Sequence, residues 1–87
     1  MARLTERNDW FELWYDDKNS IIDAMARNLA ADLAAGYSYF GQSIVKQRRA
    51  IAQYKEQMDA EIDAFKEMDE KEVNRWCYYD MKKRGAI

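Results

Sequence analysis

Apolar side chains recur at helical spacing along most of the chain, most clearly between about residues 42 and 67. Apolar residues repeat there every seven positions and form an apolar seam of Ile44, Ile51, Met58 and Phe65. This spacing predicts an amphipathic helix, which at 1.5 Å per residue would be about 39 Å long. Since a compact domain of this size is about 30 Å across, we expect the helix to overhang its own domain or to pack against a second chain.

Two shorter helices are expected ahead of that segment. The first is rich in aromatic residues and should fade near residues 16–19, where four polar residues follow one another. Ser20 and Asp23 then form an approximate capping box, so we expect a new helix to begin at Ser20. Gly36 is a suitable terminator for this second helix, because glycine readily adopts the left-handed conformation found at helix ends.

The segment from Gly36 to Gly41 leaves two arrangements open. Glycines at both of its ends favour a turn between two helices. Helical register nevertheless continues across it through Leu33 and Phe40, which would give one long helix from about residue 20 to 67. Two interior glycines would cost such a helix about 1 kcal/mol each relative to alanine, so the turn is the preferred interpretation.

The last helix has the clearest ends. Asp69 and Glu72 form a capping box at its start, and three consecutive basic residues precede Gly85 at its end. The chain has no proline and no cleanly alternating segment. We therefore predict an all-α protein with a single helical domain over residues 1–87. Its three to four helices, one of them long and amphipathic, would form a bundle or an extended helical hairpin.

Composition excludes several kinds of chemistry. The chain has no histidine and one cysteine, so neither a Cys/His zinc site nor a Ser-His-Asp triad can form. Carboxylates on a solvated helix face also lack the pocket that would separate the pKa values of a catalytic pair. We therefore expect no metal, no cofactor and no enzymatic activity. Cys77 lies on the apolar stripe of the last helix and is expected to be a buried structural thiol.

Charge and hydropathy indicate the environment of the protein. No apolar run approaches the ~20 residues of a membrane span, and the N-terminus lacks the apolar core of a signal peptide. Together with the single cysteine, this pattern predicts a cytoplasmic protein that does not act at a membrane. The net charge of −2 argues against direct nucleic-acid binding.

The strongest functional signal is the charge on residues 54–72, where eight acidic residues stand against three lysines. One side of this segment carries an acidic ridge that consists of Glu56, Asp59, Asp63, Glu67 and Glu70. Successive turns place ridge members about 6 Å apart, which is close to the phosphate step of a nucleic-acid strand. The ridge could thus mimic DNA toward a basic protein groove. The alternative is a solvated face that lysines at i±4 spacing partly neutralise.

Aromatic residues add a second candidate surface. Three Trp, six Tyr and three Phe are more than we expect the core of an 87-residue chain to bury. Exposed tyrosines are common anchors of protein interfaces, and the candidates here are Tyr39, Tyr78 and Tyr79.

Two alternatives to a partner-binding acidic ridge remain. In the first, the apolar seam is a homodimer interface and the acids only keep it soluble. In the second, the chain binds nucleic acid through two basic clusters. These are Lys46, Arg48 and Arg49, and near the C-terminus Arg75, Lys82, Lys83 and Arg84.

Residues 69–87, DEKEVNRWCYYDMKKRGAI, resemble the end of small helical proteins carried by phages, plasmids and conjugative elements of Gram-positive bacteria. The resemblance implies a setting, and it contains no catalytic motif from which residue roles could be transferred. Short acidic proteins of such elements often inhibit host defence, and some are anti-CRISPR proteins that occlude a nuclease surface. We therefore expect a non-enzymatic protein that inhibits or regulates a host factor through the acidic ridge and exposed tyrosines.

Overall fold

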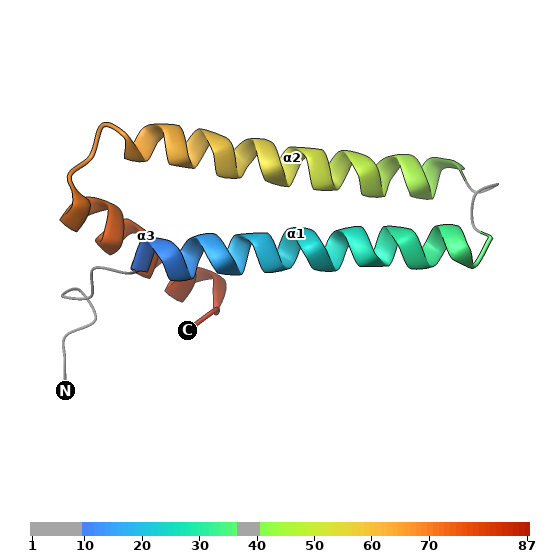
Figure 1. Cartoon of the computed structure of the whole chain (residues 1–87), viewed down its shortest axis with the longest axis horizontal. Helices are drawn as coiled ribbons and strands as arrows, with labels where there is room; N and C mark the ends of the chain where they lie inside the picture. The colour runs from blue at the N-terminus through green and yellow to red at the C-terminus, as the bar shows by residue number, and fades with distance from the viewer. Residues whose placement is uncertain (1–9, 37–40) are drawn as a thin grey trace.

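Three α-helices make up the part of the chain that the computed structural model describes, residues 10–36 and 41–87. They are α1 (Trp10–Ala34), α2 (Gly41–Phe65) and α3 (Glu70–Arg84), and these residues contain no strand. Figure 1 shows α1 and α2 side by side and antiparallel, with α3 crossing one end of the pair. The all-α prediction is confirmed, and the arrangement is an extended helical hairpin with a third helix docked at one end.

Helix α1 is one continuous helix where the sequence analysis expected two. It runs through residues 16–19 and Ser20, so the predicted fading and the predicted new start at Ser20 are both wrong. Packing explains the difference. Trp14, Lys18 and Ile22 lie one turn apart on the same face, and all three are buried. Tertiary contacts on that face keep the polar run helical despite its weaker intrinsic helix propensity.

The break between Gly36 and Gly41 is confirmed. Helix α1 ends at Ala34, Gly36 has a φ of +84°, and α2 begins at Gly41. A positive φ is strained for a residue with a Cβ atom, so glycine suits the end of this helix. The alternative of one helix from residue 20 to 67 is therefore wrong.

Both predicted ends of α3 are also confirmed. The Asp69 side chain accepts a hydrogen bond from the backbone N–H of Glu72 at 2.9 Å. At the other end Gly85 has a φ of +80°, and its N–H donates to the carbonyl of Lys82 at 3.1 Å. These local hydrogen bonds satisfy backbone groups that the helix itself leaves without partners.

The molecule is elongated because its two long helices match in length. Each has 25 residues, so α1 packs along the full length of α2. The expected overhang of α2 beyond its own domain is therefore not found. The extents are 51 × 29 × 17 Å and the radius of gyration is 16.3 Å, against about 12 Å for a compact chain of this length. The aromatic core, which includes Trp10, Trp14 and Phe65, gathers where α3 meets the hairpin.

The apolar seam proposed as a dimer interface is used inside the chain. Ile44, Met58 and Phe65 are only 7%, 5% and 7% exposed, and Ile51 is half-buried. The Phe65 ring makes edge contacts with Phe11, Trp14 and Trp76. A dimer through this seam would require the fold to open, so that assignment is corrected. The apolar side chains of this seven-residue repeat pack within the same chain, where α1 lies alongside α2.

Candidate protein-binding face

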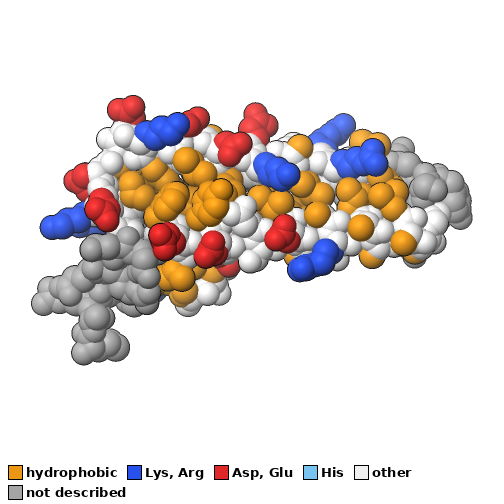
Figure 2. Space-filling model, viewed as in Figure 1, with side chains coloured by type: hydrophobic (Ala, Val, Ile, Leu, Met, Phe, Trp, Pro, Cys, Tyr) orange, Lys and Arg blue, Asp and Glu red, His pale blue; other side chains and the backbone are white. Residues whose placement is uncertain are grey.

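The acidic ridge is exposed at all five of its residues. Glu56, Asp59 and Asp63 lie in the C-terminal half of α2, where helical periodicity places them opposite the buried Met58 and Phe65. The last two members, Glu67 and Glu70, continue the ridge through the connection into the first residue of α3. In Figure 2 acidic side chains accordingly crowd the α3 end of α2.

The ridge keeps most of its negative field. The Nζ atom of Lys66 lies 3.1 Å from a carboxylate oxygen of Asp63, and their side chains are 70% and 73% exposed. A pair this exposed typically contributes less than about 1 kcal/mol and is screened by salt. The remaining carboxylates of the ridge face solvent and can act on a charged partner at a distance.

The three candidate tyrosines have different outcomes. Tyr79 is 55% exposed, whereas Tyr78 is 8% exposed and its ring centroid lies 5.1 Å from that of Trp10. The prediction that Tyr78 is a surface residue is therefore wrong. Neighbouring residues in a helix point about 100° apart, so when Tyr78 faces the core Tyr79 faces outward. Tyr39 lies outside the described residues.

Tyr79 borders an open groove of about 460 Å³ beside α3. Its apolar lining comes from Met68, Trp76 and Tyr79, and its charged lining from Glu72, Arg75, Asp80 and Lys83. Aromatic, methionine and arginine side chains are enriched at the centres of protein interfaces, so this is a suitable anchoring site. Because Met68 directly follows Glu67, the groove begins where the acidic ridge turns into α3.

The groove beside Tyr79 was not predicted from the sequence. A usable signal was present, because Glu72, Trp76, Tyr79 and Lys83 recur at three- and four-residue steps along a second face of α3. That periodicity marks a common face, but it does not say whether the face is covered.

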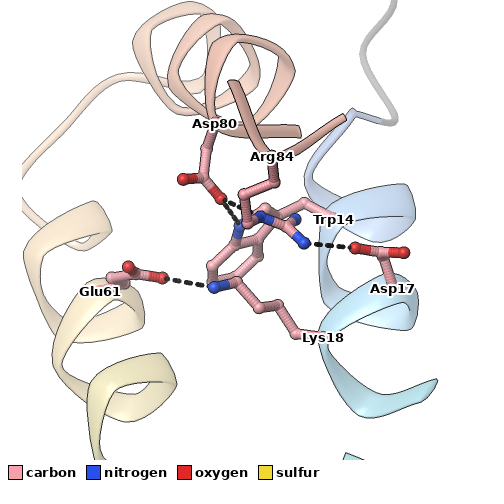
Figure 3. Close-up of polar contacts among 6 residues, drawn as sticks. All are labelled: Trp14, Asp17, Lys18, Glu61, Asp80 and Arg84. Carbon is pink, nitrogen blue, oxygen red and sulfur yellow. Dashed lines mark hydrogen bonds and ion pairs between the residues drawn. The ribbon is translucent and has the colours of Figure 1, made fainter. Parts of the chain in front are cut away.

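A polar junction under the groove holds α3 against α1 (Figure 3). The indole N–H of Trp14 donates to an Asp80 carboxylate oxygen at 2.9 Å, and Nε of Arg84 donates to the same oxygen at 3.0 Å. Arg84 also donates to Asp17 at 2.7 Å, so its guanidinium bridges the two helices. Since Asp80 also lines the groove, this junction fixes the position of the groove relative to α1.

Lys18 adds α2 to the junction. It is 6% exposed, and its Nζ lies 4.9 Å from the ring centroid of Tyr54 and 3.9 Å from a carboxylate oxygen of Glu61. That Glu61 oxygen is buried and accepts no hydrogen bond from the described residues. Burial raises the pKa of Glu61 above 4.5, although the positive charge of Lys18 opposes the shift. Neither Lys18 nor Glu61 was predicted to have a role, because a buried lysine cannot be recognised from spacing alone.

The pKa shift of Glu61 predicts a pH dependence of stability. A raised pKa means that the folded state binds this proton more tightly than the unfolded state. The resulting stabilisation is greatest below about pH 4.5 and is lost as pH rises through the folded-state pKa. We expect Glu61→Gln, which stays neutral, to gain stability relative to wild type as pH rises across that window. Denaturant unfolding from about pH 4 to about pH 8 measures the difference.

The matched control for that experiment is Glu56→Gln, on the exposed ridge. Its free energy of unfolding should follow the wild-type profile. Parallel profiles for wild type and Glu61→Gln would contradict the assigned cause of the shift.

The basic clusters are arranged differently from one another. Arg84 is engaged by two carboxylates, and Arg75 and Lys83 share the groove with Glu72 and Asp80. The C-terminal cluster therefore lies among acids of comparable number. In contrast, Lys46, Arg48 and Arg49 are exposed on the N-terminal half of α2.

Cys77 is completely buried, as expected. Burial raises the pKa of its thiol to about 12, and the nearby charges of Asp80 and Glu61 act in the same direction. Since the thiolate is the reactive form, we expect negligible labelling by a thiol reagent in the native protein and complete labelling in denaturant. Mass spectrometry of both samples measures the contrast. Rapid native labelling would mean that α3 opens readily or that the thiol is accessible.

Comparison of the chain with protein-family models, with curated proteins and with solved structures finds no match. Among the described residues no cluster of acidic or cysteine side chains could hold a metal ion. No helix in this part of the chain is both long and apolar enough to cross a membrane.

Proposed function

We propose that this protein is a non-enzymatic interaction module that binds a basic surface of a nucleic-acid-processing host protein. The acidic ridge and the groove beside Tyr79 together form its binding face. One observation carries the proposal: all five ridge carboxylates are exposed, and the ridge leads directly into an open aromatic groove.

The two parts of this face have complementary roles. A row of carboxylates attracts and orients a basic partner and raises the association rate, but charge alone provides limited affinity. The groove supplies apolar contact area through Met68, Trp76 and Tyr79, the kind of site where interface energy concentrates. The helical turn spaces the carboxylates of α2 about 6 Å apart, so a groove that holds a nucleic-acid backbone is a suitable receptor.

The C-terminal resemblance supports a more specific version of the proposal. Its setting is phages and mobile elements of Gram-positive bacteria, where small acidic proteins inhibit host defence. We propose that the partner is a host factor such as a CRISPR nuclease, and that the ridge occupies the channel that would otherwise hold DNA. The channels of such nucleases are lined with positive charge, which the ridge complements.

A charge-reversal experiment tests the binding face. Wild type and Asp59→Lys/Asp63→Lys are immobilised and exposed to a host lysate, and captured proteins are identified by mass spectrometry. Wild type should retain nucleic-acid-binding proteins that excess duplex DNA releases, and the variant should lose them. The matched control is Asp16→Lys/Asp23→Lys, which reverses two exposed acids of α1 and should bind like wild type.

Two outcomes would contradict the proposal. Equal capture by the ridge variant would exclude the ridge as the binding element. Captured proteins that duplex DNA does not release would exclude DNA mimicry. The nuclease version is tested separately with a Cas9-type enzyme and labelled target DNA, where wild type should block DNA binding and the ridge variant should not.

A further inference from the structure

Charge is divided along one face of α2. The outer face of α2 is the stripe opposite its buried side, and it consists of Val45, Arg48, Arg49, Ala52, Glu56, Asp59 and Asp63. The basic members of this stripe lie in its N-terminal half and the acidic members in its C-terminal half, where the exposed Lys55 lies at the edge of the stripe. In Figure 2 basic side chains predominate near the hairpin end of α2, and most of the acidic ones lie toward α3, with some basic side chains among them.

Nothing in the described part of the chain covers this face. All seven side chains are exposed, and Val45 is 52% exposed. Helix α1 packs against the opposite side of α2, and α3 packs mainly against α1. The outer face of α2 is therefore a straight stripe with positive charge at one end and negative charge at the other.

We propose that a second copy of this chain covers the outer face of α2, in an antiparallel dimer with twofold symmetry. The charge pattern favours this occupant. When two copies of the face lie antiparallel, the basic end of each lies against the acidic end of the other. Arg48 and Arg49 of one copy would face Asp59 and Asp63 of the other, and the twofold axis repeats each contact. Arg49 and Asp59 lie about 15 Å apart along the helix, so the axis would pass midway between them, at the level of residue 54, and Ala52 of one copy would face Glu56 of the other. The small Ala52 side chain lets the two helices approach.

This inference goes beyond the proposed function and does not depend on it. It involves Arg48 and Arg49, which have no role in the acidic binding face. The dimer would cover Asp59 and Asp63 while leaving Glu67, Glu70 and the groove open, so partner binding and self-association would compete for part of the ridge. Because the contacts are mostly exposed charge pairs, we expect a weak dimer that dissociates as salt rises.

Charge-swap variants measured by analytical ultracentrifugation test the dimer. Wild type should dimerise at low salt and dissociate at about 1 M salt, where the screening length is about 3 Å. Arg48→Glu/Arg49→Glu and Asp59→Lys/Asp63→Lys should each weaken self-association by at least about tenfold, because like charges then meet. Mixing the two variants should restore a dimer, since both of its charge contacts become complementary again. Circular dichroism verifies that each variant remains helical.

Either of two results would overturn the dimer. One is a wild-type protein that remains monomeric at low salt and high concentration. The other is a mixture of the two variants that associates no better than each variant alone. Arg48→Glu/Arg49→Glu also separates the two proposals, because it should lose the dimer and still capture the basic partner. Capture lost only in Asp59→Lys/Asp63→Lys therefore reports on the binding face alone.

Discussion

Replacing Trp14 with alanine should lower the free energy of unfolding by about 3–5 kcal/mol, the usual cost of removing a large buried aromatic side chain. Trp14 is 0% exposed, and its ring makes edge contacts with Phe65 and Trp76 at centroid distances of 5.3 and 5.9 Å. These rings belong to α1, α2 and α3, so the truncation would leave a cavity where all three helices meet. Urea unfolding followed by far-UV circular dichroism measures the loss.

The matched control is Leu13→Ala, one residue earlier on α1. Leu13 is 37% exposed, so its truncation should cost well under half as much. Trp14→Phe keeps an aromatic ring and should fold even if Trp14→Ala does not. Its loss in free energy of unfolding should lie between those of Trp14→Ala and Leu13→Ala. A Trp14→Ala cost as small as that of Leu13→Ala would contradict the central role of Trp14 in the core.

Features set by local chemistry could be predicted from the sequence. The ends of α3 depend on Asp69 and Gly85, whose side-chain acceptor and backbone freedom act within one turn of the helix. The turn after α1 likewise depends on Gly36. The exposure of the acidic ridge was predictable for a similar reason, because unpaired carboxylates on one side of a helix are too costly to bury.

Features set by tertiary contacts could not be predicted. The polar run before Ser20 stays helical because Lys18 is buried between aromatic rings and a carboxylate. The apolar seam of α2 fits a second chain and an antiparallel helix of the same chain equally well, and only the length and direction of α1 decide between them. The groove beside Tyr79 depends on how α3 crosses the hairpin, and no local pattern specifies that crossing.

Replacing Asp80 with alanine should cost about 2–3 kcal/mol, because it removes the acceptor shared by two groups at the junction. The buried indole N–H of Trp14 would lose its acceptor, and Arg84 would keep only Asp17. Since Asp80 supplies the hydrogen bond that joins α3 to the buried Trp14, we expect α3 to open more often. Urea unfolding measures the cost, and the labelling rate of Cys77 under native conditions measures the opening of α3.

Two matched variants separate the roles of Asp80. Asp80→Asn retains an oxygen that can accept from Trp14 and loses only the charge facing Arg84, so it should cost about 1 kcal/mol. Asp17→Ala removes the more exposed partner of Arg84 and should cost less than about 1 kcal/mol. If Asp80→Ala costs no more than Asp17→Ala and leaves Cys77 protected, the aromatic contacts and the hydrogen bond from the Phe11 N–H to Asn74 are enough to hold α3 in place. If the loss of stability is largest for Asp80→Ala, smaller for Asp80→Asn and smallest for Asp17→Ala, the Asp80 carboxylate is what attaches α3.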